Sequence, residues 1–119
     1  HAAALALFAG APLTDPQHQP EVVFCVNDTM ALGMLDALRF ALMLQVPRDV
    51  SVVGFDDIPS GRRPAYLLTT VSQPFEAMAE HAARILRTRV DDPAAPVQAE
   101  LLSGSLIERS SAQLLSVRY

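Results

Sequence analysis

The chain is 119 residues long, which is enough to bury the core of one domain and short for a fold with two lobes. Half of its residues are hydrophobic, its formal net charge is −4, and its nine basic residues include no lysine. This acidic balance argues against a nucleic-acid-binding surface on this chain, because phosphate contacts need clustered basic side chains. No apolar stretch is long enough for a membrane span.

The start of the chain and its single cysteine bear on its compartment. Cys25 lies in the apolar run "VVFCV" and cannot form an intramolecular disulfide, and the first residues lack the basic region of a signal peptide. We therefore expect a cytoplasmic protein. The chain begins without methionine, and "ALALFAG" (4–10) is typical of the last turns of a helix, so we expect a fragment cut inside a helix. A polar loop follows at 14–20.

A strand, a helix and a second strand come next. "EVVFCV" (21–26) and "VSVVGF" (50–55) are short apolar runs typical of buried strands, and residues 29–44 between them predict a helix with Asn27 or Asp28 as its N-cap. Because these strands are unbroken apolar runs rather than alternating ones, they favour a parallel sheet covered on both faces. The predicted fold class is α/β, a parallel sheet flanked by helices.

Polar residues follow both of these strands. In open parallel sheets, ligands bind beyond the carboxyl ends of the strands, where we expect Asn27 and Asp56 to lie. An amide donates and accepts hydrogen bonds and a carboxylate accepts them, so the pair suits a ligand that carries hydroxyl groups. The alternative is that Asn27 only caps the helix and Asp56 only starts a turn, and the spacing leaves both interpretations open.

The helix predicted at 29–44 is apolar around most of its circumference. Its few polar residues form one narrow stripe: Thr29, Asp36 and Arg39, with Gly33 between them. A helix on a sheet buries one face, so this helix needs a second partner. A subunit interface and a flanking helix of the same chain both satisfy that need.

The second half of the chain predicts one long helix between short strands. "LLTTVSQPF" (67–75) is a third strand candidate, and residues 75–90 form an amphipathic helix. After a turn, short strands are predicted at 97–102 and 105–109.

Motifs for catalysis are missing. The histidines are scattered and supply neither metal spacing nor an evident base: His1, His18 and His81. No phosphate-binding glycine motif follows a strand. The acids Asp28, Asp56 and Asp57 could hold Mg²⁺ at the sheet edge, but no lysine exists to complete a phosphotransfer site. We expect no enzyme, no cofactor and no metal.

Four phrases, in this order and at similar gaps, resemble the C-terminal part of the LacI/GalR family of bacterial transcription regulators: "FCVNDTMALGMLDALR", "VPRDVSVVGFDDIP", "LTTVSQPFEAMAEHAARIL" and "LIERSS". The match covers about residues 21–111. Family members join a helix-turn-helix head to a two-lobed effector domain of the periplasmic-binding-protein type I fold, which dimerises and binds a sugar or nucleobase between its lobes.

The resemblance implies that only the C-terminal part of the effector domain is present. Residues 1–72 and about 105–111 would belong to the C-terminal lobe, and 73–104 would pack on the missing lobe. The resemblance also implies that the DNA-binding head is absent from this sequence. Operator DNA would be bound only through that absent head. A periplasmic sugar-binding protein of a transporter shares the fold and stays as the alternative.

The resemblance also implies site residues. Asn27 in "VND", Asp56 in "GFDD", and Gln73 with Phe75 in "TTVSQPF" fall where family members often line the effector cleft. Gln73 offers a donor and an acceptor, and Phe75 offers a ring face for a sugar or a flat base. The alternative for Phe75 is a core residue that begins the helix. Asp57 would then hold the turn that places Asp56.

Assembly is implied as well. The helix at 29–44 would meet a sister subunit, so we expect a homodimer or higher oligomer with Leu32 and Leu35 buried, and with helix 75–90 open to exchange between chains. The end of the helix predicted at 29–44 departs from the family, because residues 42–44 occupy a place where members commonly carry a glycine. We expect this helix to end late or irregularly.

Overall fold

The computed structural model describes residues 1–8 and 20–113 of the chain. They divide into two compact units, one formed by the described residues within 1–72 and 106–113 and the other by Gln73–Ser105. The predicted loop at 14–20 lies almost entirely outside the described residues.

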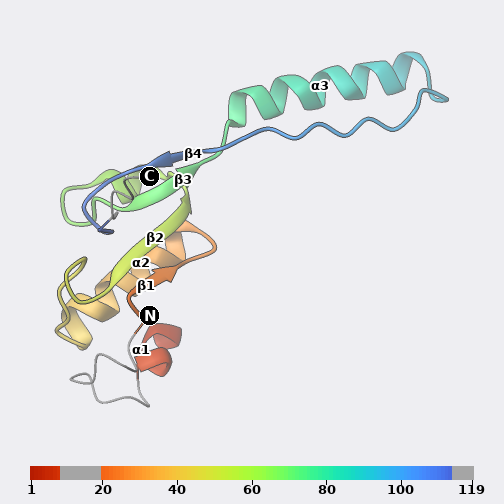
Figure 1. Cartoon of the computed structure of the whole chain (residues 1–119). Helices are drawn as coiled ribbons and strands as arrows, with labels where there is room; N and C mark the ends of the chain where they lie inside the picture. The colour runs from red at the N-terminus through yellow and green to blue at the C-terminus, as the bar shows by residue number, and fades with distance from the viewer. Residues whose placement is uncertain (9–19, 114–119) are drawn as a thin grey trace, which may run out of the picture. The chain divides into compact units, whose positions relative to one another are not determined.

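The first unit is built on a sheet with the strand order β1-β2-β3-β4, in which β1, β2 and β3 run parallel and side by side (Figure 1). The strands are β1 (Val22–Phe24), β2 (Ser51–Asp56), β3 (Thr69–Ser72) and β4 (Ser105–Ile107). The first two residues of β2 and Gly54 are buried, as are the first two residues of β3. The predicted α/β class and parallel sheet are confirmed.

Helix α2 (Asp28–Asp36) packs against β2 and continues into a π-helical turn at Ala37–Ala41, against which α1 (Ala2–Phe8) packs. The core lies between these helices and the sheet. Its largest fully buried apolar side chains are Leu35, Leu38, Val50, Val52 and Leu68. Helix α1 therefore covers part of the helical segment formed by α2 and the π-helical turn. A flanking helix of the same chain was one of the two covering partners that the sequence had left open.

The end of this helical segment is irregular, as the sequence predicted. Met43 has a φ of 56°, in the left-handed region that side chains other than glycine avoid. The N–H of Leu44 donates to the carbonyl of Leu38 at 2.8 Å, across that left-handed residue. Such closing bonds satisfy carbonyls at a helix end, and glycine normally makes the turn.

The second unit consists of α3 (Phe75–Asp91) and a return segment that runs back alongside it (Figure 1). Glu100 on the return segment pairs with Arg84 and His81 of the helix. The predicted helix is confirmed, and no residue of α3 is buried. The strand predicted at 97–102 is wrong. Val97 and Leu101 are almost fully exposed there, and the segment, which also contains Gln98 and Glu100, has no strand assigned.

Candidate functional site

Three parallel strands end at one edge of the sheet, where two of the predicted site residues lie. Asn27 follows β1, Asp56 ends β2, and Ser72 ends β3. Asp56 and Ser72 are partners in the register of the two strands. Because the carboxyl ends of parallel strands share an edge, this is the position at which open α/β sheets bind ligands.

The backbone is strained where β2 ends. Asp56 has a φ of 118° and Asp57 has a φ of 55°, so two consecutive residues with side chains occupy the positive-φ region. Such a conformation costs on the order of 1–3 kcal/mol for each residue and persists only where the surroundings enforce it. Contacts from other parts of the chain therefore have to hold the turn in this conformation.

Asp57 is held by two arginines. Its Oδ1 accepts from Arg109 Nη2 at 2.6 Å and its Oδ2 accepts from Arg62 Nη2 at 2.8 Å. The Asp57 and Arg109 side chains are only 12% and 15% exposed, so this pair is well shielded from solvent. Both carboxylate oxygens of Asp57 are thus used inside the chain, which agrees with the prediction that Asp57 holds the turn.

The segment after β4 joins the two central strands. Arg109 Nη1 donates to the carbonyl of Leu68 at 2.7 Å, and the backbone N–H of Arg109 donates to Thr69 Oγ1 at 2.9 Å. The buried Ser111 hydroxyl donates to the carbonyl of Val52 and accepts from the N–H of Thr69, both at 2.7 Å. Sequence reasoning missed this role, although "LIERSS" had carried part of the resemblance.

Asp28 is a fully buried acid beneath this edge. Its Oδ2 accepts from the N–H of Ile58 at 2.8 Å, and its Oδ1 accepts from the Thr70 hydroxyl at 2.6 Å. Gly54 makes room for it, because a Cβ at that position would lie 2.2 Å from Asp28 Oδ1. The sequence had offered Asp28 only as a helix cap or a metal ligand, and no local pattern points to these distant partners.

Asn27 is the N-cap of α2. Its Oδ1 accepts from the N–H of Met30 at 2.8 Å, and its own backbone is extended, as capping residues require. The capping role that the sequence had left as an alternative is therefore present. This cap engages the Asn27 side-chain oxygen. A contact between the Asn27 amide nitrogen and a ligand remains a prediction.

The other two predicted site residues begin the second unit. Gln73 precedes α3, and Phe75 is its first residue and is 57% exposed. Phe75 is therefore not a core residue among the described residues. A shallow hollow of about 390 Å³ is lined by Gln73, Pro74, Phe75, Glu76 and Ala77.

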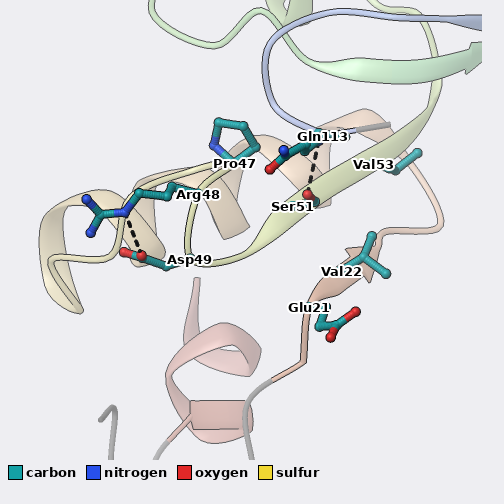
Figure 2. Close-up of a pocket in the computed structure, with 9 residues that line it drawn as sticks. Glu21, Val22, Pro47, Arg48, Asp49, Ser51, Val53 and Gln113 are labelled. Carbon is teal, nitrogen blue, oxygen red and sulfur yellow. Dashed lines mark hydrogen bonds and ion pairs between the residues drawn. The ribbon is translucent and has the colours of Figure 1, made fainter. Parts of the chain in front are cut away.

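A larger hollow of about 530 Å³ lies at the amino ends of β1 and β2 (Figure 2). Ser51 accepts there from the N–H of Gln113 at 3.1 Å, and Arg48 pairs with Asp49 at 3.1 Å. The backbone N–H of Gln45, and then Arg48, lower the pKa of Asp49 below its ordinary value. This hollow is at the opposite end of the strands from Asp56 and is separate from the candidate site.

The two leucines predicted at a subunit interface are already partly or fully covered by the chain itself. Leu35 is completely buried in the core, and Leu32 is partly buried against it. A partner subunit would therefore gain nothing by covering Leu35. The exposed apolar side chains of this helical segment are Met30, Phe40 and Met43.

Within residues 1–8 and 20–113, no group of three or more His, Cys, Asp or Glu side chains gathers in a way that could hold a metal ion. No helix in these ranges has both the length and the apolar character needed to cross a bilayer.

Comparison with known proteins adds a family to this geometry. Residues 1–112 match the family model described as a periplasmic binding protein-like domain. The ribose operon repressor of Escherichia coli (strain K12) is 39% identical over 94 residues, which are 79% of this chain and 28% of that protein. The chain spans about a quarter to a third of the length of the curated relatives that it matches.

Solved structures of transcriptional regulators are also similar to this chain. A LacI family transcriptional regulator from Lactobacillus casei with bound sucrose aligns with a TM-score of 0.70 and 33% identity, over 93% of this chain and 38% of that one. The lac repressor dimer bound to operator and the anti-inducer ONPF aligns with a TM-score of 0.76 and 26% identity, over 95% and 37%.

An open parallel α/β sheet with polar side chains at its carboxyl edge is the architecture of a ligand-binding domain of the periplasmic-binding type. The chain belongs to the periplasmic binding protein-like domain family, and the proteins that it resembles include a LacI family transcriptional regulator and the lac repressor.

Proposed function

We propose that this chain is the effector-sensing and dimerisation part of a LacI-type transcription regulator, and that its effector is a small sugar-like molecule. The observation that carries the proposal is the strained, internally braced turn that presents Asp56 at the carboxyl edge of the sheet. The sucrose bound to the Lactobacillus casei relative supports the class of ligand. A transporter binding protein is not favoured, because the relatives are repressors.

The proposed contacts follow from the chemistry of each side chain. Asp56 would accept hydrogen bonds from sugar hydroxyls through its carboxylate. Asn27 would donate from its amide nitrogen, since its oxygen caps α2. Gln73 and Phe75 would add an amide and a ring face, by their match to the family motif "TTVSQPF". No catalytic residue and no cofactor are part of the proposal.

The domain arrangement and assembly are also proposals. Residues 1–72 and about 105–111 would form the C-terminal lobe, and α3 with its return segment would pack on a part of the effector domain outside this chain. Operator DNA would be bound by a separate head. A homodimer is supported by the lac repressor relative, whose structure is that of a dimer. Leu32 and the exposed Met30 and Phe40 would then lie nearer the partner than the buried Leu35 does.

The test is a calorimetric titration of the full-length gene product with D-ribose, D-glucose, sucrose and, for comparison, adenine and guanine. Asp56→Ala should weaken sugar binding about tenfold or more, since one hydrogen bond to a charged group is worth roughly 1.5–3 kcal/mol. Asp49→Asn, a change in an acid at the opposite end of the strands, is the matched control and should bind like the wild type. Binding of a nucleobase but no sugar, or an Asp56→Ala affinity within twofold of the wild type, would refute the assignment.

A further inference from the structure

We propose that Asp28 is a positioning residue of the candidate site: its buried carboxylate fixes the start of α2 after Asn27, the turn that carries Asp56, and strand β3 relative to one another. This inference rests on the proposed function, since it concerns the same edge of the sheet. Asp28 itself would not touch the ligand, because it is fully buried below the edge and both of its oxygens have partners inside the chain.

The contacts of Asp28 reach all three segments. Asp28 is the first residue of α2 and directly follows Asn27. Its Oδ2 accepts from the N–H of Ile58, two residues beyond Asp56. Its Oδ1 accepts from the hydroxyl of Thr70 in β3, the strand that leads into Gln73. One carboxylate therefore joins a helix start, a strained turn and a neighbouring strand.

A carboxylate is the side chain that suits this place. It accepts on both oxygens, whereas an amide accepts on only one, and the donors of Ile58 and Thr70 approach different oxygens. The first turn of a helix also favours a negative charge. Gly54 provides the space, since the Cβ of any other residue would overlap Asp28 Oδ1. These features give Asp28 one position and one orientation.

The consequence for binding follows from the strain at the turn. Asp56 and Asp57 keep positive φ values only while the chain on both sides is held. Asp57 is braced by its arginines, and the chain beyond it is braced at the N–H of Ile58 by Asp28. Loss of the Asp28 contact would allow the turn to relax and the Asp56 carboxylate to leave the position that a ligand requires, and small displacements of a binding group reduce affinity strongly.

The experiment uses the full-length gene product and four variants. Asp28→Ala removes both contacts, and Thr70→Val removes the hydroxyl while it keeps the volume of the buried side chain. Thr70→Ser keeps the hydroxyl and is the conservative rescue. Leu38→Val, in the core away from this edge, is a matched destabilised control. Each protein is titrated with D-ribose, D-glucose and sucrose well below its melting temperature, and hydrogen exchange is measured in the peptide that contains Ile58.

We expect Asp28→Ala and Thr70→Val to bind the sugar about tenfold more weakly than the wild type and to exchange faster at Ile58. Thr70→Ser and Leu38→Val should stay within about threefold of wild-type affinity, which is the range that mild repacking produces. Wild-type affinity and exchange in Thr70→Val would overturn the inference, as would an equal loss of affinity in Leu38→Val. If the wild type binds none of the sugars, the proposed function fails, and the exchange at Ile58 still decides whether Asp28 holds the turn.

Discussion

Asp57 and Arg109 are 52 residues apart in the sequence, and Asp57 Oδ1 lies 2.6 Å from Arg109 Nη2 in a mostly buried ion pair. Between them the chain completes β3, leaves the first unit as α3 and returns through β4. The turn that presents Asp56 is therefore held by Arg109, a residue that follows the second unit in the sequence. The geometry of the candidate site depends on this return.

The first prediction concerns this ion pair. Arg109→Gln should lower the free energy of unfolding by roughly 2–3 kcal/mol, because removal of one partner leaves a shielded charge with weaker compensation, here only from Arg62. The measurement is urea denaturation followed by circular dichroism. Arg48→Gln removes an arginine from an exposed pair and should change the free energy by less than about 1 kcal/mol. Equal effects of the two substitutions would show that the Asp57 pair does not brace the turn.

The second prediction concerns the irregular helix end. Met43 is strongly exposed and has a φ of 56°, so its side chain contributes little packing while its backbone conformation is unfavourable. Met43→Gly should raise the free energy of unfolding by about 1 kcal/mol, since glycine adopts this region without a Cβ penalty. Thermal unfolding measures the change. Leu42→Gly, at a residue with a φ of −100°, is the control and should destabilise the protein.

The sequence predicts most of the framework for a physical reason. Unbroken apolar runs give β1 and β2 directly, and the chain order of strand, helix and strand favours a parallel pair. Asn27 and Asp56 could then be placed at one edge without any knowledge of side-chain contacts, because parallel strands share their carboxyl end. The irregular helix end could be predicted only with the help of the family resemblance, because members commonly carry a glycine where this chain has residues 42–44.

The braces of the site could not be predicted in this way. Asp28 contacts Thr70 across 42 residues of sequence, and no periodicity or turn rule relates such positions. The segment 97–102 shows the opposite error, since its alternation of apolar and polar residues makes no strand without a neighbouring strand, and none pairs with it among the described residues. Leu35 is a third case, because an apolar helix does not reveal which of its side chains enter the core of its own chain and which meet another subunit.

The last prediction concerns pH. The N–H of Gln45 and then Arg48 lower the pKa of Asp49 in the folded protein, so its ionised form stabilises the fold above the ordinary aspartate pKa of about 4. This stabilisation is lost as the pH falls through the lowered pKa. Asp49→Asn keeps an oxygen acceptor for Gln45 and removes the charge, and it should therefore be less stable than the wild type at pH 7 and at pH 5. The difference should shrink as the pH falls below about 4, because Asp49 of the unfolded wild type takes up its proton there while the folded protein keeps the charge to a lower pH. Guanidinium denaturation of both proteins at pH 7, 5 and 3 measures it, and a difference that stays constant down to pH 3 would mean that the charge of Asp49 contributes nothing.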